Sequence, residues 1–295
     1  MKFLILGATG MAGHMIALYL KERGHNVAGT FRNKSETTEY LHSRGINLIE
    51  LDVTDESKLA SVIAGSNSDV VVNCVGLLNA ECDKRPDLAV YLNTYLPHRL
   101  AFLTSSNSAR VIHISTDCVF AGNTGPYSEA SIPDGTSLYD RTKALGELND
   151  DVNLTLRQSI VGPDPDPNGI GLLNWFMQQV GVVNGWSKAI WTGLTTLELA
   201  KAVESCALSG ATGLINMVPA EGGISKYSLL RLFNESLKSH PLEIIKTNAI
   251  GLDKTLIRTR FDAEFIPAFY AEQIKELSSW IKSHDSLYPA YYLND

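Results

Sequence analysis

Short apolar runs and longer amphipathic runs alternate along the first half of the chain. The apolar runs have the length of strands buried on both faces, and the amphipathic runs have the spacing of helices. The expected strands lie at residues 2–8, 25–32, 46–53, 69–76, 110–115 and 153–161. The expected helices lie at residues 10–24, 56–65 and 89–107, with a further one around Tyr139. Strands that alternate with helices form a parallel sheet covered on both faces, so the pattern predicts a doubly wound α/β fold of the Rossmann type.

The regular alternation of apolar and amphipathic runs ends after Val161. The segment "GPDPDPNGIG" (162–171) is too irregular for a regular element and is long enough for a lid or a pocket wall. Helices are expected at 172–180, 195–208, 225–238 and 271–284, and a strand at 213–218. We therefore expect one domain over residues 1–160 and a second part over residues 161–295. Elements at about 192–218 are expected to return to the sheet.

Composition and charge describe an ordinary globular chain of 295 residues with 44% hydrophobic and 19% charged positions. The net charge of −7 argues against nucleic acid as a partner, although it does not exclude a small anionic ligand. The four cysteines are far apart in sequence and favour buried or idle thiols over a metal or redox site, so we expect no metal. The apolar run before Gly7 is too short for a signal peptide, and no run of 18 apolar residues occurs. These features predict a cytoplasmic protein with no membrane partner.

Three glycines stand where the first expected strand meets its helix. Gly7, Gly10 and Gly13 allow a tight turn and let a pyrophosphate approach the helix N-terminus. A purely structural turn is the alternative interpretation. Because the glycines lie in the first strand-turn-helix unit of the sheet, we expect residues 1–160 to bind a dinucleotide.

The end of the second strand indicates which dinucleotide. In "TFRNK" the basic residues Arg32 and Lys34 flank Asn33, where an acid would hold the ribose of NAD. The pattern favours NADP(H) and leaves NAD(H), or a solvated basic loop, as alternatives. Asp52 and Val53 end the third strand and are expected beside the adenine, although Asp52 is equally suited to a turn.

A hydroxyl-bearing segment and a Tyr-x-x-x-Lys pair carry the candidate chemistry. Ser115, Thr116 and Asp117 follow the fifth strand, at the edge where open α/β sheets bind ligands. Tyr139 and Lys143 are four residues apart, so on a helix they share one face. A turn around Asp117 and a chance Tyr/Lys pair are the plain alternatives.

Taken together, these motifs resemble the extended short-chain dehydrogenases/reductases. The stretch "STDCVFAGNTGPYSEASIPDGTSLYDRTKALGE" is similar to dTDP-4-dehydrorhamnose reductases and related nucleotide-sugar 4-ketoreductases. The resemblance covers residues 1–160 well and the remainder loosely. It implies that Thr116, Tyr139 and Lys143 hold the catalytic positions and that Tyr139 and Lys143 also bind the cofactor. It further implies cofactor contacts from Met11, Cys74, Val75, Gly76 and Asn93, and substrate contacts from Ser115, Asp117, Val119 and Phe120.

Ketone reduction suits these residues, because hydride addition builds negative charge on the oxygen. We expect Tyr139 to donate the proton, Lys143 to lower the pKa of Tyr139 and bind the nicotinamide ribose, and Thr116 to polarise the carbonyl. Ser115 is the alternative to Thr116.

The substrate side of the sequence is less decisive. The family has a polar motif near the C-terminus, where "DKTLIRTRF" retains Lys254 but carries Ile257 and Arg258 instead of the usual polar pair. Arg258 and Arg260 are suited to a diphosphate or to a plain surface. Trp175 is suited to stack on a base or sugar, or to lie in the core.

The sequence therefore predicts NADPH-dependent reduction of the 4-keto group of a nucleotide-activated 6-deoxy sugar, for surface-polysaccharide precursors. One alternative is a nucleotide-sugar epimerase or dehydratase with tightly bound NAD. Another is a non-catalytic, NADP-binding regulatory subunit, which the retained Tyr139 and Lys143 argue against. The expected partner is the nucleotide-sugar substrate, and a homodimer is left open.

Overall fold

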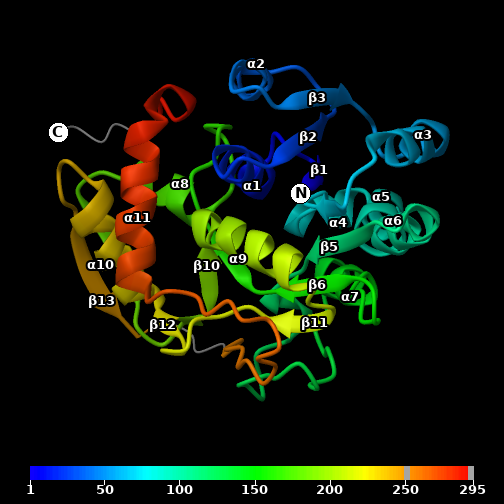
Figure 1. Cartoon of the computed structure of the whole chain (residues 1–295). Coiled ribbons are helices and arrows are strands. Elements are labelled where there is room, and N and C mark those ends of the chain that lie inside the picture. Colours follow the sequence, from blue (N-terminus) through cyan, green and yellow to red (C-terminus); the bar gives the residue numbers. More distant parts are fainter. Residues whose placement is uncertain (249–252, 292–295) are drawn as a thin grey trace.

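A seven-stranded parallel sheet is the central feature of the computed structural model, which describes residues 1–248 and 253–291 (Figure 1). The strands lie in the order β11-β6-β5-β4-β1-β2-β3, and all neighbours pair in parallel. Their bounds are β1 Lys2–Leu6, β2 Asn26–Phe31, β3 Asn47–Glu50, β4 Val70–Asn73, β5 Arg110–Ile114, β6 Leu154–Arg157 and β11 Gly213–Asn216. The doubly wound parallel sheet that the sequence predicts is confirmed.

Two apolar cores lie on the two faces of this sheet. Phe3 and Ile5 of β1 pack into one core with α1 and α9, whereas Leu4 and Leu6 pack into the other with α3 and α6. The alternation follows from the pleat of a strand, which directs successive side chains to opposite faces. The helices around the sheet are α1 Met11–Glu22, α2 Glu36–Ser43, α3 Glu56–Ser66, α6 Leu96–Thr104, α7 Leu138–Leu145 and α9 Thr196–Ser209.

The strand order reverses beside β1. The chain runs from β1 outward through β2 and β3, and then returns to β4 on the opposite side of β1. In open α/β sheets the crevice at such a reversal, beyond the carboxyl ends of the strands, is where ligands bind. The ends of β1 and β4 therefore mark the place for a site.

The region between β4 and β5 differs from the single helix expected over 89–107. Helical structure begins earlier and comes in pieces: α4 Asn79–Lys84, α5 Pro86–Ala89, a π-helical turn Val90–Tyr95, and then α6, which a short 3₁₀ turn Ser105–Asn107 follows. A π-helical turn widens a helix locally and is frequent at functional sites. Here it contains Asn93, whose side chain reaches out to two other segments, as described below.

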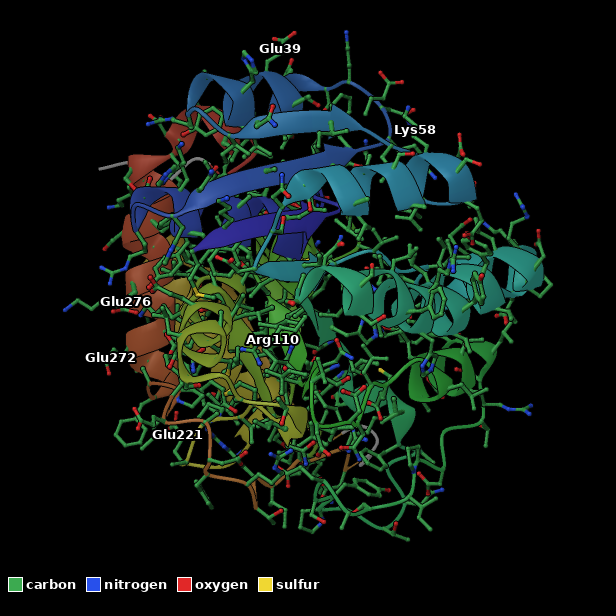
Figure 2. All side chains as sticks on the ribbon, turned by 45° about the vertical axis from the view of Figure 1, so that its right-hand side comes forward. Glu39, Lys58, Arg110, Glu221, Glu272 and Glu276 are labelled. Atoms are coloured by element: carbon green, nitrogen blue, oxygen red, sulfur yellow. The ribbon has the colours of Figure 1, made fainter. Side chains whose placement is uncertain are left out.

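Short strand pairs and three helices form the rest of the chain, beside the sheet (Figure 1). The pairs are β7 Ser159–Val161 with β10 Gly193–Thr195, β9 Ile190–Trp191 with β12 Ile224–Ser225, and β8 Val182–Trp186 with β13 Glu243–Thr247. The helices are α8 Leu172–Met177, α10 Lys226–Leu237 and α11 Tyr270–Ser283, and two 3₁₀ turns lie at Asp117–Val119 and Asp285–Leu287. Figure 2 shows Glu272 and Glu276 projecting from the outer side of α11.

The C-terminal half also contributes to the sheet. β11 pairs with β6 at the sheet edge. α9 precedes it, and its last carbonyls, with that of Ala211, accept hydrogen bonds from Arg110 of β5. The division into a dinucleotide-binding part up to residue 160 and a mainly substrate-binding part beyond it stays a prediction. No helix in the part of the chain that the structure describes is both long and apolar enough to span a membrane.

Candidate active site

The glycine turn lies where β1 meets α1. Gly7 has a φ of +76°, in the left-handed region that favours glycine. A Cβ on Gly13 would lie 2.0 Å from the carbonyl oxygen of Gly7, so no larger residue fits there. α1 begins at Met11 after Gly10, and no side chain caps its first turn. The amide groups of that turn are therefore available to a phosphate.

A cavity of about 860 Å³ opens beside this turn. That volume lies at the upper end of the range for small-molecule and cofactor sites. The predicted cofactor residues that line it are Gly7, Gly10, Arg32, Asp52, Val53, Cys74, Val75 and Gly76. Its lining does not include the other predicted cofactor residues, which are Met11, Gly13, Asn33, Lys34, Asn93, Tyr139 and Lys143. The turn and the cavity fit a dinucleotide.

Arg32 and Asp52 lie at the far end of this cavity, beyond β2 and β3. The carboxylate of Asp52 accepts hydrogen bonds from the backbone N–H and the hydroxyl of Thr54, at 2.9 and 2.8 Å. These bonds, with a smaller contribution from the Arg32 charge, lower the pKa of Asp52. Asp52 therefore serves as a turn residue and also borders the cavity, while Arg32 supplies a cation there.

Several residues that line this cavity were not predicted from the sequence. Arg85 and Asp87 form a bidentate ion pair at the cavity edge. Tyr91, also in the lining, donates its hydroxyl to the carbonyl of Val53. The remaining missed lining residues are Thr9, Thr30, Phe31, Leu51, Thr54, Leu77, Leu88 and Leu92. A sequence signal existed for Thr9, which lies within the glycine turn, and for Thr30 and Phe31, the last two residues of β2.

Thr116 and Tyr139 lie close together between β5 and α7. Ser137 begins α7 with a reciprocal capping box to Asp140, which fixes the start of the helix. The Thr116 hydroxyl donates to the Asp117 carboxylate at 3.2 Å and accepts from the Cys118 amide at 3.1 Å. Burial raises the pKa of Tyr139 above its ordinary value, and the neighbouring Thr116 hydroxyl opposes that shift. Tyr139 is thus a protonated phenol at neutral pH.

Lys143 is buried one turn further along α7. Its ammonium nitrogen, Nζ, donates to the carbonyl of Ile114 at 2.8 Å and lies 3.4 Å from His113 Nε2. Burial lowers the pKa of Lys143 from 10.5 to about 8. Lys143 is not among the groups that shift the pKa of Tyr139, which is raised rather than lowered. The expectation that Lys143 lowers the pKa of Tyr139 is therefore wrong for this structure, because both side chains are buried and Lys143 points toward β5.

Asn93 connects the cavity wall to the catalytic helix. Its Oδ1 accepts from the amide of Leu77 at 2.8 Å, and its Nδ2 donates to the Leu77 carbonyl and to the Thr142 hydroxyl. Leu77 lines the cavity and Thr142 precedes Lys143. Asn93 therefore links the cavity wall at Leu77 to α7 at Thr142. This is the supporting role that the family resemblance implies for Asn93, and its contact with the cofactor stays a prediction.

Ser115 and Thr116 have different partners. The Ser115 hydroxyl donates to the Glu147 carboxylate at 2.7 Å, and Glu147 also accepts from Arg157, which is buried. The Thr116 hydroxyl likewise donates to a carboxylate, that of Asp117, but Thr116 lies beside Tyr139 and Ser115 pairs on the side of Arg157. This difference favours Thr116 as the polarising hydroxyl, and the choice between the two stays a prediction.

Two other predicted substrate residues belong to the core. Val119 and Phe120 are fully buried in an apolar cluster with Tyr127, and the Phe120 ring stacks on the Tyr127 ring at 4.1 Å between centroids. The prediction that they contact substrate is wrong, because no surface of either side chain is exposed. Asp117 is also buried, and burial raises its pKa, while the charge of Lys254 opposes that shift. Asp117 holds the Thr116 hydroxyl.

The two C-terminal arginines have structural partners. Arg258 donates through Nε, Nη1 and Nη2 to the carbonyls of Arg260, Phe265 and Ala263, at 2.5–2.6 Å. Arg260 pairs with Asp262 and donates to the carbonyl of Leu214. Their donors are therefore occupied in shaping the segment at 258–265, and the prediction that these arginines clamp a diphosphate is corrected.

Trp175 lines a second cavity, of about 480 Å³, in the C-terminal part. Its side chain is 42% exposed, so it is not a core residue. Trp186 and Lys226 lie across from it, with the Lys226 nitrogen 5.5 Å from the Trp186 ring centroid. Leu172 begins α8 and also lines this cavity, while the preceding Gly171 faces the sulfur of Met11. The residue before this cavity's Leu172 therefore lies near the side chain of Met11, the first residue of α1.

The cysteines are all free thiols. Burial raises the pKa of Cys74 to about 12 and that of Cys118 to about 11, so both are protonated at neutral pH. Within residues 1–248 and 253–291, no three His, Cys, Asp or Glu side chains are grouped as metal ligands.

Comparison with known proteins begins with residues 1–158, which match the family described as RmlD substrate binding domain. A relative in Haloferax volcanii, "Probable low-salt glycan biosynthesis reductase Agl14", is 32% identical over 165 residues, 53% of this chain and 52% of the relative. "Methionine adenosyltransferase 2 subunit beta" of Xenopus laevis is 32% identical over 146 residues, 49% of this chain and 41% of the relative. The chain thus spans about half the length of these relatives or less.

Two longer matches cover nearly the whole chain. "dTDP-4-dehydrorhamnose reductase" of Streptomyces griseus is 24% identical over 307 residues, 98% of this chain and 93% of the relative. The crystal structure of a dTDP-4-dehydrorhamnose reductase from Bacillus anthracis in complex with NADP superposes with a TM-score of 0.74. It is 16% identical and covers 96% of this chain and 99% of that chain, which is a likeness of fold.

Proposed function

Because the chain belongs to the family of the RmlD substrate binding domain, we propose that it is an NADPH-dependent reductase. Its substrate is a nucleotide-activated 6-deoxy sugar with a keto group at carbon 4, and its product serves surface-polysaccharide precursors. Residues 1–160 bind the dinucleotide and residues 161–295 mainly bind the substrate. The names of the reductases to which the chain is similar support this proposal.

The observation that carries the proposal is the grouping of Thr116, Tyr139 and Lys143 beside the cofactor cavity. Cys74 lines that cavity and lies in the electrostatic field of Lys143. Asn93 bonds both the cavity wall at Leu77 and the catalytic helix at Thr142. A ketone bound between the cavity and α7 therefore meets a hydroxyl and a protonated phenol.

The chain's own residues supply the proton and the positioning. Bound NADPH supplies a hydride to the carbonyl carbon. Tyr139 donates its phenolic proton to the carbonyl oxygen as negative charge develops there, and the Thr116 hydroxyl gives that oxygen a second hydrogen bond. In the structure the single proton of that hydroxyl is donated to Asp117, so the hydroxyl must turn from Asp117 to the substrate for this bond to form. Lys143 binds the nicotinamide ribose.

The second cavity suits the nucleotide half of the substrate. Trp175 and Trp186 provide flat apolar faces on which a base stacks, and Lys226 provides a cation for a phosphate. Gly171, which precedes Leu172 of this cavity, lies near the Met11 side chain of α1, so we expect a substrate in this cavity to extend its sugar toward the cofactor. This cavity replaces the two arginines as the proposed recognition site.

A regulatory subunit of the same fold is the second candidate, favoured by the similarity to a protein named as a subunit of methionine adenosyltransferase. The retained Tyr139 and Lys143 argue for turnover instead. A nucleotide-sugar epimerase or dehydratase with tightly bound NAD is disfavoured by Arg32, which places a cation at the 2′ end of the cavity.

Consumption of NADPH with a panel of nucleotide 4-keto sugars tests these candidates. A reductase oxidises one equivalent of NADPH for each sugar reduced, whereas an epimerase or dehydratase shows no net consumption. The Tyr139→Phe variant is the matched control, since its cofactor affinity should equal that of the wild type. A protein that binds NADPH but oxidises none with any sugar would point to the regulatory role.

A further inference from the structure

A chain of directional hydrogen bonds runs from the end of β4 to the catalytic lysine. It begins at the amide of Val75, which donates to Asn73 Oδ1 at 3.1 Å. With its oxygen engaged there, Asn73 presents its NH₂ group to His113, and Nδ2 lies 3.1 Å from His113 Nδ1. Since an NH₂ group only donates, His113 Nδ1 must accept. A neutral imidazole has one acceptor nitrogen, so the ring proton resides on Nε2.

His113 Nε2 faces Lys143 Nζ at 3.4 Å. An Nε2–H donor requires a lone pair on its partner, which a neutral amine has and an ammonium lacks. Lys143 Nζ meanwhile donates to the carbonyl of Ile114, and an amine can do so. Only one arrangement of protons satisfies all four contacts: Val75 to Asn73, Asn73 to His113, His113 to Lys143, and Lys143 to Ile114. In that arrangement Lys143 is uncharged.

Burial reinforces the geometry. His113 is completely buried, and that burial keeps its pKa well below the ordinary value. His113 is therefore neutral at physiological pH and offers Lys143 a fixed N–H rather than a carboxylate counter-ion. The other groups that act on Lys143 are Glu147 and the thiols of Cys74 and Cys82. Glu147 is already bonded to Arg157, and burial raises the pKa of both thiols.

We propose that His113 is a positioning residue that stabilises the neutral amine of Lys143 in the free protein, so that in alkaline solution, where that amine is populated, cofactor binding is coupled to uptake of one proton by Lys143. The inference rests on the proposed use of a dinucleotide. The proton comes from solvent and adds to the amine lone pair. The ammonium then leaves the Nε2–H of His113 and turns toward the ribose hydroxyls and the phosphates, which accept hydrogen bonds.

This coupling has a direction and a pH range. The pKa of Lys143, lowered to about 8, marks the range in which free protein changes charge. Below this pH Lys143 is already protonated, so binding of the dinucleotide requires no uptake of a proton. Above it each bound dinucleotide takes up a proton, so affinity falls by up to about tenfold for each pH unit. Burial raises the pKa of both thiols above the ordinary value, so neither thiol is expected to account for a change of affinity near pH 8.

The test compares wild type, His113→Gln and His98→Gln by titrating NADPH from pH 6.5 to 9.5. A glutamine at 113 can turn its carbonyl oxygen to Lys143 and so favours the ammonium. The pH at which affinity begins to fall should move upward by about one unit, the worth of one hydrogen bond. His98 is exposed and acts on His113 only through its charge, so His98→Gln should follow the wild type.

A second measurement needs no cofactor. Nitrogen-15 spectra of the histidine side chains should include a signal from a neutral ring that carries its proton on Nε2 from pH 6 to 9, with Nδ1 as acceptor, and that disappears when His113 is replaced. Loss of that signal in His113→Gln assigns it. A His113 that carries its proton on Nδ1, or an onset that is unchanged in His113→Gln, would overturn the proposal. A protein that binds NADPH at no pH would instead overturn the proposed function and leave the tautomer result to decide the His113 contact.

Discussion

Ser115 donates its hydroxyl to Glu147 at 2.7 Å, so two adjacent hydroxyl residues at the end of β5 have separate tasks. Ser115 serves a buried ion pair beneath the site, and Thr116 faces Tyr139. Replacing Thr116 with Val should lower kcat roughly 10²–10³-fold, because one hydrogen bond to the developing oxyanion is lost. Thr116→Ser, which keeps the hydroxyl, should retain most of the activity.

Ser115→Ala is the matched control for the Thr116 variants. Glu147 keeps both bonds to Arg157, so the loss should be about 1 kcal/mol in the free energy of unfolding with kcat/KM near that of the wild type. Denaturant unfolding and steady-state rates measure the two effects. The assignment of Thr116 would fail if Ser115→Ala proved the more damaging to turnover.

The sequence could predict the sheet because its signals are local. Apolar runs, the glycine turn and the capping box that begins α7 depend on neighbours a few residues away. Thr116, Tyr139 and Lys143 were accessible for the same reason, since a strand end and a helix spacing place them. The effect of these residues on one another could not be predicted from the sequence, because the pKa of Tyr139 depends on burial by the whole fold.

The sequence also could not predict in which direction several side chains point. Whether Arg258 meets a phosphate or three carbonyls is decided by the path of the chain at 258–265, which leaves no periodic signal. Val119 and Phe120 resemble substrate contacts in sequence but turn into the core, because Tyr127 and Leu256 return beside them. Arg85 lies between α4 and α5, before the helix expected over 89–107, and Tyr91 lies in a π-helical turn that the sequence did not predict, so neither could be placed at the cofactor cavity.

Tyr139→Phe should lower kcat by roughly 10²–10⁴-fold and leave NADPH affinity unchanged, because only the transferred proton is removed. Burial raises the pKa of Tyr139, so the phenol stays protonated as pH rises, and deprotonation should not limit kcat below pH about 10. A kcat profile at saturating NADPH checks this. A fall in kcat centred near pH 8 under those conditions would contradict a buried, protonated acid.

Arg32 should determine the preference for NADPH over NADH. Loss of one charge-assisted hydrogen bond costs about 1.5–3 kcal/mol, so Arg32→Ala should weaken NADPH roughly 10- to 100-fold and NADH little. Lys34 lies outside the cavity lining, and Lys34→Ala is therefore the matched control with a small effect. Calorimetric titration of the wild type and both variants with both dinucleotides measures the affinities. Equal wild-type affinities for NADPH and NADH would rule out this role for Arg32.

Arg258 should matter for stability rather than for recognition. Arg258→Ala leaves three buried or half-buried carbonyls without their donor, so the free energy of unfolding should fall by about 2–4 kcal/mol. Arg260→Ala should cost less, since Arg260 pairs with the exposed Asp262. Thermal unfolding checks the order. A large rise in KM for the sugar nucleotide in folded Arg258→Ala protein, with an unchanged Tm, would restore the role in diphosphate binding.

Trp175 should carry part of the affinity for the nucleotide. Stacking of a base on an aromatic side chain is worth about 1–3 kcal/mol, so Trp175→Ala should raise KM for the sugar nucleotide roughly 5- to 100-fold. NADPH affinity should not change, because Trp175 lines the second cavity and not the first. Val180, three residues beyond α8 and 86% exposed outside both linings, provides the control Val180→Ala. Trp186→Ala should behave like Trp175→Ala, and the double variant should lose less than the sum of the two losses if both rings bind one base. If both single variants kept the wild-type KM, the nucleotide would have to bind elsewhere.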